Sequence, residues 1–270
     1  SRQSRGLGDV YKRQEVNYRK IPISRNKKGK RFIQSDDVAI ESLVKLTVNN
    51  EPMANLLASP EDCNDLILGH LLTEGYVPIT TKLDKSNITI NQDEYGTILV
   101  DLICLDIEIN HRKSLGITTT SCGACKLDGM DLLIDGLPSV EPLKNFDNSV
   151  LYQGLVKMSE NQTGFLKTGG MHCAGLLSSD GILQYHSEDI GRHNAVDKVI
   201  GKAFGNVDLN DSILLLSGRC GWDIVAKAAR CNISYIASIG ACSSLAASCA
   251  RHLGITIHSF VKENSSVIIG

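Results

Sequence analysis

Two cysteines three positions apart are the clearest chemical feature of the sequence. Residues 118–125 have the sequence TTTSCGAC, in which the thiols belong to Cys122 and Cys125. Thiols at this spacing meet across a tight loop or a helix start, where backbone N–H groups and the helix dipole lower a thiol pKa. A thiolate can accept a sulfur atom, and a neighbouring thiol can relay or release it by exchange. A persulfide carrier is therefore one interpretation of the pair.

Three other interpretations of the pair stay open on these residues alone. Half of a tetrahedral zinc site needs two more ligands, but the sequence has no second C-x-x-C motif. A thioredoxin-like redox motif follows a β-strand directly, and the elements expected ahead of this pair differ from that order. Two small packing residues are disfavoured because Ser, Thr and Gly surround the pair instead of apolar side chains.

A run of polar residues follows an expected strand at residues 187–198, SEDIGRHNAVDK. Capping and ion pairing at a helix start account for many polar residues in such places. They account less well for Arg192, His193 and Asn194, because three consecutive side chains cannot share one solvent-exposed face of a helix. We therefore expect these three residues to shape a site for a polar ligand.

Glycine-rich junctions between strands and helices are a third feature. The sequences SGRCG at residues 217–221 and GACSS at 240–244 each follow an expected strand, and GGMH at 169–172 is another flexible loop. Ligands of open α/β sheets bind at the carboxyl ends of strands, and helix N-termini attract phosphate. Arg219 adds a fixed charge whose fork geometry suits phosphate. These junctions predict an anion site.

The first half of the chain has the pattern of an antiparallel sheet with one helix. Residues 38–58 predict a hairpin that turns at 49–52, and strands are expected at 87–91 and 97–103. The helix should begin at a Ser59 cap and end at Gly75. A loop at residues 116–136 runs into a short helix, and residues 137–170 are expected to be a bridge between the two halves.

Strands and helices alternate in the second half of the chain. This order predicts a three-layer α/β unit with a mostly parallel sheet. The expected strands are 175–178, 182–186, 212–216, 235–239, 255–260 and 266–269, and the expected helices are 191–204, 222–231 and 243–252. We divide the chain into residues 1–14, a leader or sequence-derived leftover; 15–136, a β-rich domain that ends in the CGAC loop; and 137–270, an α/β cofactor-binding domain.

Composition narrows the class of protein further. The 270 residues include nine cysteines, an odd number, and no secretory signal pattern is present. Free thiols in a reducing cytoplasm are therefore expected, and no run of about 18 apolar residues predicts a membrane span. Residues 1–31 hold eleven Lys or Arg residues against Asp9 and Glu15. Residues 25–31 are interpreted as a solvated turn, and no nucleic-acid partner is expected.

These segments together resemble a known family. In chain order, CGAC at residues 122–125, His172, SEDIGRHNAVDKVIG at 187–201 and SGR at 217–219 are similar to the formate dehydrogenase accessory sulfurtransferases, the FdhD family. The resemblance runs from about Val38 to the C-terminus. It implies a cytoplasmic homodimer with a fold similar to that of cytidine deaminases.

The resemblance also implies an activity and its residues. Such a protein accepts sulfur from a cysteine desulfurase and passes it to the molybdenum (or tungsten) bis(molybdopterin guanine dinucleotide) cofactor that formate dehydrogenase needs. The cofactor is then a bound substrate, and no intrinsic metal is expected. Cys122 would carry the persulfide and Cys125 would be its partner. The cofactor-binding residues are expected to be His172, Arg192, His193, Asn194, Ser217, Gly218 and Arg219, together with Phe260, Val261, Lys262, Glu263, Asn264 and Ser265.

Two alternatives of other classes are kept. A zinc-dependent nucleoside or base deaminase needs H-x-E and P-C-x-x-C motifs. The chain has His186-Ser187-Glu188, but this follows the cysteine pair instead of preceding it, and Ser121 replaces the proline. The second alternative is a chaperone that inserts the cofactor without moving sulfur.

Overall fold

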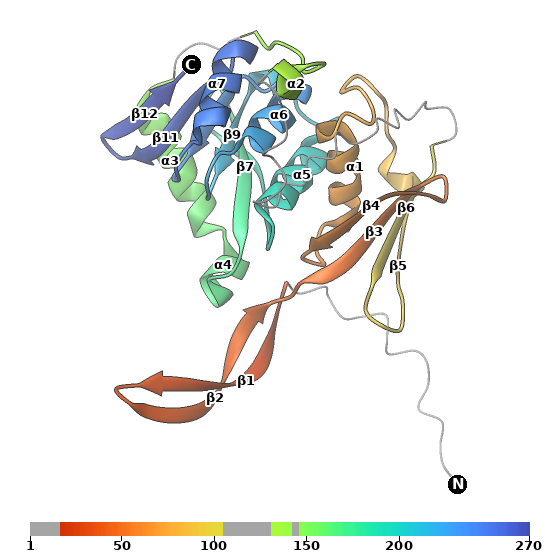
Figure 1. Ribbon diagram of the computed structural model, residues 1–270, viewed down its shortest axis with the longest axis vertical. Helices are drawn as coiled ribbons and strands as arrows, with labels where there is room; N and C mark the ends of the chain where they lie inside the picture. The colour runs from red at the N-terminus through yellow and green to blue at the C-terminus, as the bar shows by residue number, and fades with distance from the viewer. Residues whose placement is uncertain (1–16, 105–130, 142–145) are drawn as a thin grey trace.

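The computed structural model describes residues 17–104, 131–141 and 146–270, and these residues form three β-sheets (Figure 1). A four-stranded and a six-stranded sheet form the body of the molecule with the helices between and around them, and a two-stranded arm projects from that body (Figure 1). Within the described ranges, no helix has both the length and the apolar character needed to cross a bilayer.

The four-stranded sheet contains the predicted hairpin. Asn49 and Asn50 both have positive φ, 53° and 65°. These are the angles that a two-residue hairpin turn requires, and asparagine tolerates them. Alternate residues of the preceding strand are buried: Val44, Leu46 and Val48. The strands are β3 (Ser42–Val48), β4 (Glu51–Ala58), β5 (Ile88–Gln92) and β6 (Ile98–Leu102), in the order β4-β3-β6-β5; β3 and β6 are parallel and the other pairs are antiparallel.

The helix after this hairpin begins later than the sequence predicts. Helix α1 (Cys63–Thr73) has Asp62 at its N-cap position, so the expected Ser59 cap is wrong. Ser59 instead serves a tertiary contact. Its backbone N–H donates to Asp189 Oδ2 at 2.9 Å, and its hydroxyl accepts the backbone N–H of Ile190 at 3.0 Å. Because the Ser59 hydroxyl accepts a hydrogen bond from the chain just after β8, it does not cap α1.

The six-stranded sheet is mixed, not mostly parallel. Its three central strands are parallel to one another, but a hairpin at each side adds antiparallel neighbours. One of these hairpins turns at Asp180-Gly181, as predicted. The strands are β7 (His172–Ser178), β8 (Leu183–Asp189), β9 (Ser212–Leu216), β10 (Tyr235–Ser238), β11 (Thr256–Lys262) and β12 (Ser265–Ile269), in the order β12-β11-β10-β9-β7-β8.

Helices cover both faces of the six-stranded sheet, which confirms the three-layer α/β unit. The period of two in β9 divides its side chains: Leu214 and Leu216 join one core, while Ile213 and Leu215 join the other. The larger core lies under α5 (Arg192–Ala203), α6 (Trp222–Arg230) and α7 (Ser244–Leu253) and continues through α1 into the four-stranded sheet; the smaller lies under α3 (Asn148–Glu160).

The segment expected to be an irregular bridge contains regular helices. The bridge at residues 137–170 holds α3 and α4 (Thr163–Thr168), which follow a short α2 (Asp131–Ile134). In α3, Leu151, Leu155 and Met158 recur at helical spacing and are buried, and this signal was overlooked among the nearby Gly and Pro residues. Single 3₁₀ turns lie at Lys85–Asn87 and Leu209–Asp211.

The expected solvated turn at residues 25–31 is the tip of a longer hairpin. Strands β1 (Tyr18–Lys27) and β2 (Lys30–Ala39) pair in antiparallel register around Lys28 and Gly29. Both turn residues have positive φ. The turn was therefore predicted correctly, but the flanking strands were missed because charged residues interrupt their apolar pattern.

Close packing of α1 against α5 joins the two sheets (Figure 1). A Cβ atom added at Gly69 would collide with the carbonyl oxygen of Asp197, and one added at Gly201 would collide with the carbonyl oxygen of Asp65. Each helix therefore presents a glycine to the backbone of the other. The two helices can come this close only because both positions lack a side chain.

A buried ion pair fixes the start of α5. Lys198 and Asp189 are both fully buried, and Lys198 Nζ lies 2.6 Å from Asp189 Oδ2. The same ammonium donates to the carbonyl oxygen of Ser59 at 2.8 Å. Asp189 also accepts the backbone N–H of Gly191 and the side-chain amide of Asn194. This cluster ties the end of β4, the end of β8 and the first turns of α5 together.

A second buried charge cluster joins α1, α5 and α6. Lys227 Nζ donates to Asp197 Oδ1 at 2.7 Å, to Glu74 Oε1 at 2.6 Å and to the hydroxyl of Thr73 at 2.9 Å. Burial alone would raise the pKa of Asp197, but Lys227 and the hydrogen bond from His70 outweigh burial and hold this pKa at about 2. The carboxylate is thus charged near neutral pH and balances the buried ammonium.

We predict that Gly69→Ala destabilises the protein. The added methyl group would force α1 and α5 apart, at a cost of about 1–3 kcal/mol in the free energy of unfolding. Gly170→Ala is the control, since its Cβ would lie 3.7 Å from the nearest atoms, and it should leave stability unchanged or raise it by up to about 1 kcal/mol. Urea denaturation measures both, and equal stabilities would contradict the close helix approach.

We also predict that replacing two lysines one turn apart on α5 lowers the free energy of unfolding by very different amounts. Lys198→Met leaves Asp189 buried without its cation and should cost about 3–5 kcal/mol. Lys202→Met removes a partly exposed pair with Asp62, whose side chains are 33 % and 36 % exposed, and should cost at most about 1 kcal/mol. Chemical denaturation compares the two variants, and similar losses would show that the buried pair does not anchor the helix.

Candidate functional site

The predicted ligand-binding loops meet at one end of the six-stranded sheet. Strands β9, β10 and β11 are parallel, so their carboxyl ends lie together, and β7 starts at the same end because it runs antiparallel to β9. We call this region the carboxyl end of the large sheet. It holds His172, Ser217, Gly240 and Phe260 from four separate segments. Ligands of open α/β sheets bind in this position.

Backbone contacts hold these loops against one another. The N–H of Ser217 donates to the carbonyl oxygen of Cys173 at 3.0 Å, and its hydroxyl accepts the Cys173 N–H at 2.8 Å. The Phe260 N–H donates to the carbonyl oxygen of Gly240 at 3.1 Å. A Cβ atom on Gly240 would lie 2.7 Å from the carbonyl oxygen of Gly218. Glycine at position 240 is thus required for the two loops to pack together.

Two arginines bring positive charge to this end of the sheet, close to a histidine. The pKa of His172 is lowered by burial and by the positive charges of Arg192 and Arg219, which places three predicted residues near one another. A fourth predicted residue, Gly218, lies beside the imidazole, since its Cβ would be 3.1 Å from His172 Nδ1. Near neutral pH, His172 is therefore a neutral side chain under the influence of two cations.

Arg219 and Arg192 differ in their contacts with carboxylate groups. Arg219 is exposed and has no ion pair within the described residues. Arg192 begins α5, and its guanidinium lies 3.3 Å from Asp223 Oδ2. A guanidinium that pairs with no carboxylate of the described residues, next to the starts of α6 and α7, is suited to a ligand that carries phosphate.

Asp223 is a site residue that the sequence analysis missed. Its carboxylate contacts both Arg192 and His193 Nε2. Burial lowers the pKa of His193, and the carboxylate of Asp223 opposes that effect without cancelling it. Asp223 lies in the first turn of α6, directly after the predicted SGRCG loop. That position was a usable signal, but an acidic residue there is commonly explained by helix capping.

Asn194 holds the fold together at the rim of the site. Its side-chain amide donates to the carbonyl oxygen of Leu57 at 2.8 Å and to Asp189 Oδ1 at 3.0 Å. Only 7 % of the residue is exposed. The amide hydrogens are therefore engaged in positioning α5. A direct contact between this residue and a ligand stays a prediction.

The predicted segment 260–265 divides into parts with different surroundings. Phe260 has a positive φ of 51° and is half-exposed beside Gly240, whereas Val261 is buried in the smaller core. The backbone carbonyls of Lys262 and Glu263 accept the side-chain amide of Asn148. The remaining predicted residues, Asn264 and Ser265, are exposed at the β11–β12 turn.

The predicted catalytic pair Cys122 and Cys125 lies outside the described residues, so its position relative to this site stays a prediction. The proposed domain boundary at 136/137 likewise stays a prediction. Among the described residues, no group of three or more His, Cys, Asp or Glu side chains is arranged to hold a metal ion.

The histidine and glutamate that the deaminase alternative requires are both part of regular structural elements. Glu188 accepts the backbone N–H groups of Gly164 at 2.7 Å and of Phe165 at 2.8 Å, so its carboxylate satisfies the first turn of α4. His186 lies on β8 opposite Gly175, and burial lowers its pKa. The acidic residue that a deaminase would need for proton transfer is thus committed to a helix start.

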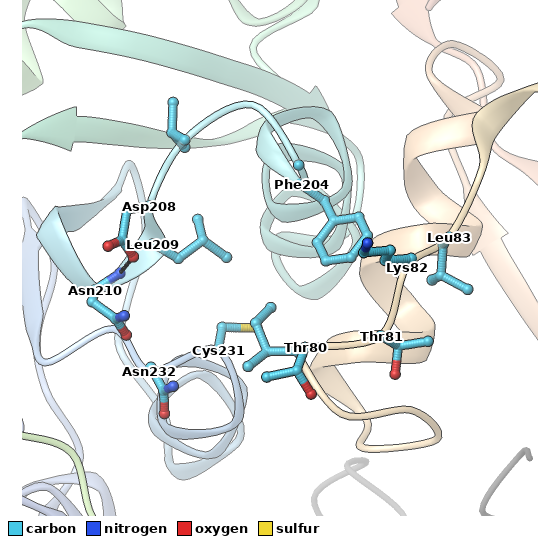
Figure 2. Close-up of a pocket in the computed structure, with 13 residues that line it drawn as sticks. Thr80, Thr81, Lys82, Leu83, Phe204, Asp208, Leu209, Asn210, Cys231 and Asn232 are labelled. Carbon is cyan, nitrogen blue, oxygen red and sulfur yellow. Dashed lines mark hydrogen bonds between the residues drawn. The ribbon is translucent and has the colours of Figure 1, made fainter. Parts of the chain in front are cut away.

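A separate cavity lies away from the carboxyl end of the large sheet (Figure 2). It has a volume of about 460 Å³ and is lined by residues 79–83, 204–205, 207–210 and 231–232. Figure 2 shows Phe204 and Leu209 facing Cys231 across it. Burial raises the pKa of the Cys231 thiol to about 12, so this thiol is not a nucleophile near neutral pH. The cavity contains none of the predicted site residues.

Curated proteins resemble the chain over most of its length. A protein of Picrophilus torridus is 34 % identical over 244 residues, covering 88 % of this chain and 90 % of its own. A protein of Sulfolobus acidocaldarius is 33 % identical over 260 residues, covering 92 % and 94 %. A protein of Corynebacterium efficiens is 32 % identical over 247 residues, covering 85 % and 87 %. All three carry the name "Sulfur carrier protein FdhD".

A solved structure shares the fold. The crystal structure of a protein assigned as a formate dehydrogenase accessory protein from Desulfotalea psychrophila superposes with a TM-score of 0.70 at 22 % identity, covering 94 % of this chain and 96 % of its own. The model of the FdhD/NarQ family matches residues 39–269. This match includes the carboxyl end of the large sheet and the polar start of α5. The chain belongs to the FdhD/NarQ family.

Proposed function

We propose that this chain is a sulfur carrier that serves formate dehydrogenase. It accepts sulfur from a cysteine desulfurase and passes it to the molybdenum (or tungsten) bis(molybdopterin guanine dinucleotide) cofactor. The names of the curated relatives and the length of the family match support the carrier role. The protein acts in the cytoplasm as a homodimer, without nucleic-acid or membrane partners.

The observation that carries the proposal is the positive carboxyl end of the large sheet. His172, Arg192 and Arg219 gather there from three segments, and the N-termini of α6 and α7 begin beside them. The proposed substrate carries several phosphates, which helix N-termini and arginines bind. The glycines at positions 218 and 240 let the backbone approach such a ligand closely.

The sulfur steps follow ordinary thiol exchange. The thiolate of Cys122 attacks the outer sulfur of the desulfurase persulfide, a Cys122 persulfide forms, and the desulfurase thiolate leaves. Attack by the Cys125 thiolate on the inner sulfur then transfers the outer sulfur, as sulfide, to the cofactor. This second step leaves a Cys122–Cys125 disulfide, which a thiol reductant returns to two thiols. Arg219 and Arg192 would hold the phosphates of the cofactor during the transfer.

We predict that Cys122 gains one sulfur atom from a cysteine desulfurase and free cysteine. Peptide mass spectrometry should show a gain of about 32 Da on the peptide that holds Cys122, since a persulfide adds one sulfur. Cys122→Ala should abolish the adduct and the activation of formate dehydrogenase. Cys104→Ala is the control, because burial and Asp101 raise the pKa of that thiol, and it should keep the adduct.

Two outcomes of this experiment favour the alternatives. Full activation of formate dehydrogenase by Cys122→Ala would support a cofactor-insertion chaperone. Stoichiometric zinc that is lost in Cys122→Ala would support a deaminase.

We also predict that Arg219→Gln weakens binding of guanosine diphosphate, which represents one end of the proposed cofactor. Loss of one charge-assisted contact should raise the Kd roughly tenfold. Arg25→Gln, on the β1–β2 arm and paired with Asp36, should bind as the unmodified chain does. Isothermal titration calorimetry measures both variants. Equal affinities of Arg219→Gln and the unmodified chain would show that Arg219 does not contact the nucleotide.

A further inference from the structure

Two cysteines meet where the loops after β9 and β10 lie side by side. Cys220 and Cys242 form an isolated parallel bridge beyond the ends of the two strands. The Cys220 N–H donates to the carbonyl oxygen of Ala241 at 2.9 Å, and the Ser243 N–H donates to the carbonyl oxygen of Cys220 at 3.1 Å. These two hydrogen bonds fix the backbones of the two loops relative to each other.

The bridge brings the two thiols within reach of a covalent bond. Paired residues on neighbouring strands lie about 4.8 Å apart, and their side chains point to the same side. A disulfide needs Cα atoms roughly 4.4–6.8 Å apart. The two thiols also interact electrostatically, since each shifts the pKa of the other. A bond between the two sulfur atoms therefore requires no rearrangement of the loops.

The two thiols differ in exposure and in pKa, as the attacking and resolving thiols of an exchange reaction should. Cys242 is half-buried, whereas Cys220 is fully buried. The interaction between the two thiols raises the pKa of Cys220, which burial raises further, and lowers the pKa of Cys242. Cys242 is thus the accessible thiol with the greater thiolate fraction, and Cys220 is the protected thiol directly beside it.

We propose that Cys220 and Cys242 are a thiol–disulfide pair that low-molecular-weight disulfides oxidise. In the first step, the Cys242 thiolate attacks one sulfur of a disulfide such as oxidised glutathione. A mixed disulfide forms on Cys242, and one glutathione thiolate leaves. In the second step, the proton of Cys220 passes to water, and the resulting thiolate attacks the Cys242 sulfur. The Cys220–Cys242 disulfide forms, and the second glutathione leaves, so two protein thiols are oxidised as one glutathione disulfide is reduced.

This modification site is distinct from the Cys122–Cys125 pair and does not depend on the proposed sulfur transfer. Because of where the two cysteines lie, a disulfide between them would affect the carboxyl end of the large sheet. Cys220 directly follows Arg219, and Cys242 directly precedes the Ser243 cap of α7. A disulfide would lock the loop that holds Arg219 to the loop that precedes α7.

Peptide mapping tests the proposal. The reduced full-length protein is incubated with excess oxidised glutathione, free thiols are blocked by alkylation, and the protein is digested with trypsin. We expect a disulfide-linked pair of peptides 220–227 and 231–251, with fragmentation that assigns the bond to Cys242. Cys242→Ala should abolish the linked pair. Cys249→Ala is the matched control because Cys249 is in the same peptide but buried in α7, and it should keep the linked pair.

A further variant separates the two steps. In Cys220→Ala no resolving thiol remains, so the glutathione adduct on Cys242 should accumulate. The proposal is overturned if Cys220 and Cys242 are both recovered as alkylated thiols from the folded, glutathione-treated protein. It is also overturned if the linked pair forms through Cys231 or Cys249. The result with Cys242→Ala stands even if Cys220→Ala does not fold, because Cys242 is only partly buried.

Discussion

The ion pair between Lys198 and Asp189 is the contact on which the arrangement of this molecule depends. Both side chains are fully buried, and removing two charges from water is costly unless every polar atom finds a partner. The ammonium uses Asp189 and the carbonyl of Ser59, and the carboxylate accepts N–H groups from Ser59, Gly191 and Asn194. These partners belong to the end of β4, the end of β8 and the start of α5. The charge cluster can be satisfied only when the four-stranded sheet, the six-stranded sheet and α5 occupy their observed positions.

The geometry of the candidate site follows from that arrangement. Asp189 ends β8 opposite His172, so the contact that fixes α5 also fixes where Arg192 stands relative to the start of β7. The parallel order of β9, β10 and β11 then brings their following loops to the same end of the sheet. Two arginines that are 27 positions apart in the sequence consequently act on one imidazole. Helices of ordinary amphipathic composition complete the site because their N-termini point toward it.

Local periodicity predicted most elements of the second half, because a period of two in β9 and the helical spacing in α5 are imposed by burial on one face. The overlooked α3 shows the limit of that reasoning. Its buried Leu151, Leu155 and Met158 have helical spacing, yet the prolines and glycines around them suggested a bridge. The mixed sheet was mispredicted for another reason. Alternation of strands and helices does not reveal that edge hairpins add antiparallel strands on both sides of a parallel centre.

The sequence by itself determined the chemical groups, the order of the elements and the family. Motif spacing is a property of the chain, and the block at residues 187–201 can be read without knowing its surroundings. Only the tertiary structure decided which polar residues hold the fold and which stay available at the carboxyl end of the large sheet. Asn194 and Arg192 are two positions apart, yet the first is committed to Leu57 and Asp189, while the second stands beside Asp223 and His172. It also decided that Cys220 and Cys242 are neighbours. Contacts between residues far apart in the sequence depend on the packing of whole sheets and helices, and no local pattern records them.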